Sequence, residues 1–198
     1  MNPAQWTAPP LKISHSEPAA AVRLAAYLKA CMRPLAQGRS IVVVCLGTDR
    51  STGDSLGPFT GTALANRRTA DFDLYGTLED PVHAMNLEDT LSAIRKRHSR
   101  PLVIGIDACL GKPASVGYLY AGTGPIRPGA GVNKELPPVG DLHVSGVVNI
   151  GGFMEYFVLQ NTRLHLVVTM AETIAMGVSE AIRQTMEETD YSPRSLFR

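Results

Sequence analysis

The sequence predicts an α/β domain with a mainly parallel β-sheet that is covered by helices on both faces. Residues 41–46 and 102–106 are continuous apolar runs rich in Val and Ile, which is typical of strands buried on both faces. Stretches with apolar residues at helical spacing alternate with these runs, as in βαβ units. With 198 residues and 44% hydrophobic residues, the chain is long enough for one core, so residues 1–198 are expected to form a single domain.

The expected elements follow one another along the chain. The first part is expected to contain a tail or strap (1–14), a helix (from about 16 to 32), a strand (41–46), a glycine-containing loop (47–57), a helix (58–68), a strand (72–78) and a helix (87–98). The second part is expected to contain a strand (102–106), a short edge strand (116–120), a long loop rich in Gly and Pro (122–141), a helix (144–159), a last strand (164–169), a final helix (171–188) and a frayed tail (189–198).

The loops that follow the strands are the places to look for function. In doubly wound sheets, ligands bind outside the carboxyl ends of the strands, near the point where strand order reverses. The loop after the first strand is neither a dinucleotide-binding fingerprint nor a P-loop, because the glycine spacing and the Gly-Lys-Ser/Thr ending are absent. It does carry Asp54 at the entrance to a helix, and Asp107 ends the strand 102–106.

Each of these two acids has a structural interpretation as well as a functional one. Asp54 suits a helix N-cap, and Asp107 suits a turn residue that accepts hydrogen bonds from nearby backbone. If their strands are neighbours, however, the two carboxylates converge. Keeping two close carboxylates ionised costs free energy because their charges repel, so such a pair shares a proton or binds a metal. Either arrangement activates a water molecule.

Other polar residues lie near the same edge in this interpretation. His143, just before an expected helix, is either an ordinary surface histidine or the third member of an Asp/Asp/His metal set. Thr48, Asp49 and His83 follow the first two strands and are candidate substrate-binding residues.

The long loop carries one more polar cluster. Asn133, Lys134 and Glu135 form either a solvated loop tip or a substrate clamp.

Several other functions are disfavoured by the sequence. The net charge of +1 argues against a nucleic-acid partner, and the short apolar runs argue against a membrane span. No motif supports a thiol hydrolase built from Cys109 and His143. Three cysteines without a Cys-x-x-Cys pair suggest reduced thiols in a cytoplasm.

Three segments together resemble a known group of proteins. The loop ending Asp54-Ser55-Leu56-Gly57-Pro58, the segment Ile106-Asp107-Ala108, and residues 128–136 (PGAGVNKEL) are similar to motifs of the germination protease of spore-forming bacteria. Over about residues 39–182 the chain resembles the YyaC family of sporulation-associated proteins. That family is similar to the germination protease and, more distantly, to the hydrogenase maturation endopeptidases.

The resemblance implies a fold, a site and an activity. The fold would be a phosphorylase/hydrolase-like three-layer α/β/α sandwich. The two aspartates on which the germination protease depends correspond to Asp54 and Asp107. In the hydrogenase endopeptidases an acid, an aspartate and a histidine bind nickel or a substitute ion, which would correspond to Asp54, Asp107 and His143.

Three functions are therefore open at the level of sequence. The first is an aspartate-dependent peptidase that needs no cofactor. The second is a maturation-type endopeptidase that needs a divalent metal, and the third is a non-catalytic peptide-binding protein. The expected partner is a peptide or small spore protein, with no nucleic acid and no membrane. The sequence does not decide whether the chain forms a homo-oligomer. By resemblance the location is the cytoplasm of the forespore or mother cell.

Overall fold

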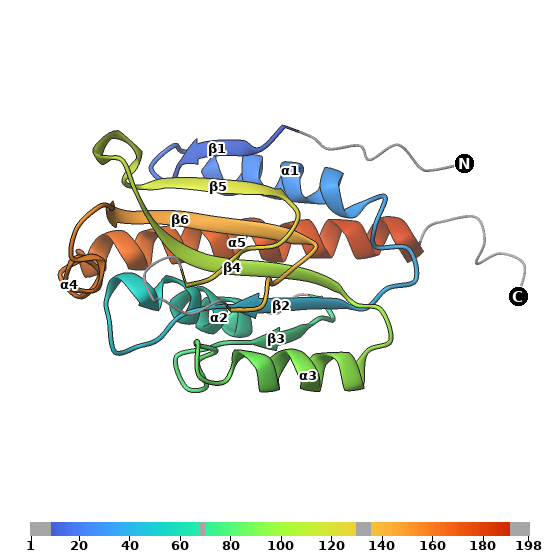
Figure 1. Ribbon diagram of the computed structural model, residues 1–198. Coiled ribbons are helices and arrows are strands. Elements are labelled where there is room, and N and C mark those ends of the chain that lie inside the picture. Colours follow the sequence, from blue (N-terminus) through green and yellow to red (C-terminus); the bar gives the residue numbers. More distant parts are fainter. Residues whose placement is uncertain (1–8, 68–69, 130–135, 191–198) are drawn as a thin grey trace, which may run out of the picture.

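A six-stranded sheet forms the centre of the computed structural model, which describes residues 9–67, 70–129 and 136–190 (Figure 1). Its strand order is β1-β5-β6-β4-β2-β3. The strands are β1 (Leu11–Ser14), β2 (Ile41–Cys45), β3 (Asp73–Tyr75), β4 (Leu102–Gly111), β5 (Tyr118–Thr123) and β6 (Leu142–Ile150). The four strands from β6 to β3 are parallel, while β5 and β1 pair antiparallel at one side. The sheet is thus mostly parallel, as the sequence predicts.

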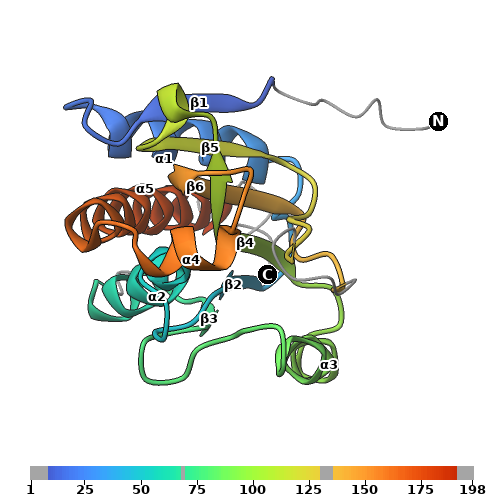
Figure 2. The same ribbon diagram turned by 60° about the vertical axis from the view of Figure 1, so that its left-hand side comes forward.

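Helices cover both faces of this sheet. The α-helices are α1 (Ala20–Met32), α2 (Leu56–Asn66), α3 (Leu87–Arg97), α4 (Glu155–Gln160) and α5 (Leu164–Asp190), and two 3-10 turns are η1 (Gly53–Ser55) and η2 (Pro113–Ser115). Helices α1, α2 and α5 lie on one face and α3 on the other, which makes the expected three-layer sandwich (Figures 1 and 2). The expected α/β sandwich is therefore confirmed.

Strand β2 shows why an unbroken apolar run suits this position. Val43 and Cys45 pack in the large core beneath α1, α2 and α5. Val42 and Val44 point to the opposite face and pack with Leu87 and other residues of the α3 layer. Both faces of β2 are buried, so polar alternation would place polar groups in one of the two cores.

The order of the strands reverses between β2 and β4, and this reversal positions the candidate site. After β2 the chain crosses to β3 on one side, and after β3 it returns to β4 on the other side. The last residue pair between β2 and β4 is Cys45 with Ile106, and the Leu46 N–H donates to the Ile106 carbonyl at 2.7 Å. Residues just beyond this point therefore face one another at the carboxyl edge, where α/β sheets bind ligands.

The helix expected over residues 144–159 is wrong. Most of it is strand β6, which runs parallel to β4, and only Glu155–Gln160 forms a short helix. The side chains of Leu142 and Val144 point into the core and alternate with the half-buried His143. This period of two indicates a strand, but the glycines within it weaken the signal.

The last strand expected over residues 164–169 is also wrong, because these residues form the first turns of α5. A short apolar run does not by itself distinguish a buried helix from a strand. Within the described residues, α5 is the helix whose length and composition would also suit a membrane span, but 61% of its candidate window is buried in the protein. It packs against α1 and the sheet as a core helix does.

Three smaller corrections concern the other strands. Part of the expected N-terminal strap, Leu11–Ser14, is the edge strand β1, with Ile13 fully buried. As a result β5 is an interior strand rather than the expected edge strand. Strand β4 extends to Gly111, so Asp107 lies within a strand rather than at its end.

Candidate active site

The loop after β2 folds back tightly on the end of its own strand, and two glycines permit this. A Cβ on Gly47 would lie 1.8 Å from the Asp54 carbonyl oxygen, and a Cβ on Gly57 would lie 1.9 Å from that of Leu46. The Thr48 N–H also donates to the Asp54 carbonyl at 3.1 Å. These close approaches hold η1, which carries Asp54, against the carboxyl end of β2.

Asp54 and Asp107 are brought together at this edge, as the sequence predicts. Asp107 lies one residue beyond the last β2–β4 pair, where β4 no longer has β2 beside it. Burial raises the pKa of Asp107 to about 8; the Ala108 N–H, which donates to its Oδ1 at 2.8 Å, opposes this shift, and the nearby Asp54 carboxylate adds to it. The two acids therefore interact electrostatically.

The pKa of Asp54 is raised as well, again chiefly because burial disfavours its charged form, while the Ser51 hydroxyl opposes this shift. With a pKa of about 8, the Asp107 carboxyl keeps its proton at neutral pH. One protonated and one ionisable carboxyl at the same edge make a pair that can donate a proton and accept one.

Sequence reasoning missed two residues around this pair. Ser51 is buried, and its hydroxyl lies close enough to Asp54 to lower the pKa of that carboxyl. Among the described residues, no partner of this hydroxyl meets both the distance and the angle of a hydrogen bond. Ser145 stands opposite Asp107 in the β4–β6 ladder, and its hydroxyl interacts with the Cys109 thiol. Ser145 could have been found only by assigning residues 142–150 as a strand, and no sequence signal distinguishes Ser51.

Cys109 does not supply a reactive thiolate here. Burial raises the pKa of Cys109 to about 11, the Ser145 hydroxyl opposes the shift, and the Asp107 carboxylate adds to it. A thiol with this pKa is almost fully protonated at neutral pH, and the nucleophilic form is the thiolate. The geometry gives no support to a thiol hydrolase at this position.

His143 lies within strand β6 and not just before a helix, as the sequence suggests. Its ring leans toward β5 and not toward β4, the strand that carries Asp107. Its Cα pairs with Gly105 on one side and Gly122 on the other. The ring lies over β5, where a Cβ on Gly122 would come within 2.8 Å of it, and Nδ1 is 3.0 Å from the Gly124 carbonyl oxygen. Because β5 and β4 flank β6 on opposite sides, this ring is directed away from Asp107.

The donor set does not fit the metal centre that the hydrogenase endopeptidases suggest. Among residues 9–67, 70–129 and 136–190, no three His, Cys, Asp or Glu side chains are grouped so that they could hold a metal ion. The pair of acids alone supplies two carboxylates, and His143 is committed to the β5 side. We therefore assign no step to a metal ion.

The remaining predicted residues lie around the edge. Thr48 accepts a hydrogen bond from the Arg50 N–H at 3.3 Å in an exposed turn with Asp49. His83 follows Val82, whose carbonyl accepts from the Gly47 N–H at 2.8 Å, so it lies beside the same loop.

The Nδ1 atom of His83 accepts a hydrogen bond from the Met85 N–H at 3.3 Å. The cluster Asn133, Lys134 and Glu135 falls outside the residues that the structure describes.

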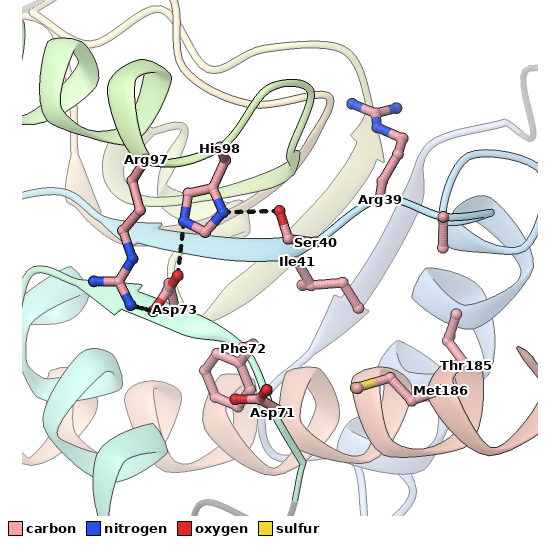
Figure 3. A pocket seen from close by; sticks show the side chains of 12 residues that line it. Arg39, Ser40, Ile41, Asp71, Phe72, Asp73, Arg97, His98, Thr185 and Met186 are labelled. Atoms are coloured by element: carbon pink, nitrogen blue, oxygen red, sulfur yellow. Dashed lines mark hydrogen bonds and ion pairs between the residues drawn. The ribbon is translucent and has the colours of Figure 1, made fainter. Parts of the chain in front are cut away.

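A cavity of about 360 Å³ lies at the opposite, amino edge of the sheet (Figure 3). His98 there connects Ser40, with Oγ 2.9 Å from Nδ1, to Asp73, with Oδ2 2.7 Å from Nε2. Ser40 leads straight into β2 in extended backbone, without the sharp turn that exposes a nucleophilic serine. We interpret this chain of contacts as an attachment of the end of α3 to β2 and β3.

Comparisons with known proteins show the family and the fold of this chain. Residues 12–177 match the family described as "Protein of unknown function (DUF1256)". The chain is 52% identical over 181 residues to the Bacillus subtilis (strain 168) protein named "Uncharacterized protein YyaC". This match covers 91% of this chain and 88% of that protein. A similar solved structure is the NiFe hydrogenase maturation protease HycI from Thermococcus kodakarensis KOD1. Its TM-score is 0.50 at 16% identity, over 77% of this chain and 99% of that one, so this likeness concerns the fold alone.

Proposed function

This chain belongs to the DUF1256 family, which includes YyaC, and we propose that it is a peptidase that hydrolyses peptide bonds with Asp54 and Asp107. The observation that carries the proposal is the pairing of two desolvated carboxyls at the carboxyl edge, one of which holds its proton at neutral pH. The fold shared with a maturation protease supports it without fixing the substrate or the mechanism.

The two acids take different roles in the proposed reaction. Asp54, in its ionised form, accepts a proton from a water molecule as the water oxygen attacks the peptide carbonyl carbon. Asp107 donates its proton to the carbonyl oxygen, so the tetrahedral intermediate carries no full negative charge. When the C–N bond breaks, Asp54 passes a proton to the leaving nitrogen and the carbonyl oxygen returns one to Asp107.

The proposed substrate is a small spore protein or a sporulation precursor in the cytoplasm of a spore-forming bacterium. The similarity of the loop around Asp54 and of the segment around Asp107 to the germination protease supports this assignment. The assignment to forespore or mother cell is part of the same proposal.

Cleavage of spore proteins tests the proposal directly. An extract of spore proteins is incubated with the wild-type chain, with Asp107→Asn and with Asp54→Asn, and new peptide N-termini are counted by mass spectrometry. We expect new termini with the wild type and at least a 100-fold lower rate with either variant, since removing a proton donor or acceptor costs about 10²–10⁴ in rate. Asp89→Asn, at an exposed acid of α3, is the matched control and should cleave normally. Equal cleavage by Asp107→Asn would remove Asp107 from the mechanism.

A peptide-binding protein without catalysis is the second candidate. The observation that favours it is the group of exposed aromatic side chains near the site, which includes Phe153, Tyr156 and Phe157. On this alternative no new termini form with any variant, while peptides bind equally well to the wild type and to Asp107→Asn.

A further inference from the structure

The exposed apolar side chains of this protein are concentrated in one short stretch. In the described part of the chain nine large apolar residues are exposed, and six of them fall between residues 150 and 164. These six, which we call the apolar rim, are Ile150, Phe153, Met154, Tyr156, Phe157 and Leu164. Single exposed apolar residues are ordinary, but a contiguous group marks an interaction surface.

The apolar rim lies on and around α4, the helix that packs against the turn carrying Asp54. Helix α4 packs on η1: a Cβ on Gly53 would lie 2.7 Å from Leu159 Cδ2 and 3.0 Å from Thr162 Oγ1, and Gly53 precedes Asp54. The end of β6 also stays beside the end of β4, since the Gly151 N–H donates to the Gly111 carbonyl at 2.9 Å. Figure 2 shows α4 between the ends of the central strands and α2.

The rim is held in place rather than collapsed into the core. The Asn149 side-chain amide donates to the Val158 carbonyl at 3.1 Å and lies 3.2 Å from Thr162 Oγ1, which ties α4 to the end of β6. Leu159 faces the core, so Phe153 and Phe157 are left 83% and 56% exposed. Met154 has φ = +52°, a strained value for a non-glycine residue, at the start of this helix.

The surroundings of the rim indicate the chemistry of its occupant. Between residues 150 and 164 only Glu155 and Arg163 carry side chains of the charged types Asp, Glu, Lys and Arg, so the surface offers apolar contacts and little charge. Six side chains are far fewer than the roughly 20–30 residues that each partner supplies to a standard stable protein interface. A short peptide segment with apolar side chains fits this size better than a second copy of the chain does.

We propose that the apolar rim docks aromatic and aliphatic side chains of the peptide that the aspartate pair receives. This inference rests on the proposed function and adds to it a substrate class: uncharged, apolar segments within a few residues of the scissile bond. Phe153, Tyr156 and Phe157 form the centre of the docking surface.

A library of displayed random dodecapeptides tests the inference in the Asp107→Asn background, where binding is measured without cleavage. Phe153→Ser combined with Phe157→Ser removes the centre of the rim. The matched control is Val22→Ser combined with Met176→Ser, which removes two exposed apolar side chains from α1 and α5. Tyr156→Ser alone is the second, milder variant, and near-ultraviolet circular dichroism checks that each variant keeps its tertiary structure.

We expect enrichment of aromatic and aliphatic peptides on the parent and on the control. The affinity of an enriched peptide, measured by fluorescence anisotropy, should fall at least tenfold in the double rim variant and about threefold in Tyr156→Ser. No enrichment, enrichment of charged peptides, or unchanged affinity in the rim variants would overturn the inference. So would a dimer in sedimentation velocity that the rim variants, but not the control, dissociate, because a second copy would then cover the rim.

Failure of this inference is distinguishable from failure of the proposed function. If the active chain cleaves the enriched peptides, the double rim variant should raise KM at least tenfold and leave kcat within about twofold. An unchanged KM rejects the docking role while the peptidase stands. Peptides that bind through the rim but are never cleaved reject the peptidase while the docking surface stands.

Discussion

The most informative single residue is Asp107, because its environment decides its protonation. It sits on a strand whose neighbour β2 has just ended, so it is desolvated by the surrounding protein yet reachable from the loop that carries Asp54. A carboxyl on a more exposed loop would be ionised at neutral pH and could act only as a base. In the proposed reaction, this environment lets Asp107 act as the acid and Asp54 as the base.

The raised pKa predicts how the stability of the protein depends on pH. From pH 4 to pH 8 the unfolded chain ionises Asp107, whose ordinary pKa is 3.8, while the folded protein keeps the proton until about pH 8. The folded state then binds more protons, so the free energy of unfolding falls as pH rises, by at most roughly 6 kcal/mol from this group, and levels off above pH 8.

Asp107→Asn should therefore gain stability relative to the wild type as pH rises from 4.5 to 8.5. Urea unfolding at several pH values measures this, with Asp89→Asn, at an exposed acid of α3, as the control. Parallel curves for the wild type and Asp107→Asn would show that Asp107 titrates normally.

The same proton sets the alkaline limit of the proposed peptidase. Cleavage should decline above about pH 8, because Asp107 then loses the proton that it donates to the carbonyl oxygen. A profile of kcat against pH on one defined peptide measures this. Full activity at pH 10 would contradict the role of Asp107 as the acid.

At the scale of elements, β2 and β6 differ in how far the sequence predicts them. The β-branched run of β2 and the helical spacing of α3 are strong local patterns, and both elements form where expected. Residues 142–150 contain a glycine at 146, where a Cβ would lie 2.6 Å from Leu56 and 2.7 Å from Met170. Only tertiary packing explains this glycine. The local sequence pattern around it indicates a weak helix, because the pattern does not contain the packing against Leu56 and Met170.

Asn149 should fix α4, and with it the apolar rim. Asn149→Ala removes the amide that contacts Val158 and Thr162, which should cost about 1 kcal/mol and increase hydrogen exchange across α4 at least several-fold. Asn161→Ala is the matched control, because its amide contacts only the exposed Phe157 carbonyl at 2.8 Å. Equal exchange in both variants would show that Asn149 does not hold this helix.

At the scale of the whole molecule, the sequence predicts the layers and one pair of residues, and the fold explains the rest. Asp54 and Asp107 could be paired in advance because each follows an apolar run, 41–46 or 102–106, and the strands that contain these runs are neighbours in the sheet. His143 could not be placed, since its direction depends on the antiparallel strand β5 and on Gly122. The sequence pattern predicts a helix from residue 144, so the strand β6 that carries His143 was not predicted.

This placement predicts that His143 is dispensable for cleavage. His143→Gln should keep at least half of the wild-type rate, because its ring lies over β5 and contacts the Gly124 carbonyl. The rate should likewise stay within twofold after dialysis against a chelator. A hundredfold loss in either case, restored by a divalent ion after chelation, would favour the metal-dependent alternative.

The most direct test of the aspartate pair is a titration of the Asp107 side-chain carboxyl by carbon-detected NMR in the wild type and in Asp54→Asn. A coupled, desolvated pair predicts that Asp107 titrates near pH 8 in the wild type and at a lower pH when Asp54 loses its charge. An Asp107 carboxyl that titrates near pH 4 in both proteins would contradict the pairing and, with it, the assignment of this edge as the active site.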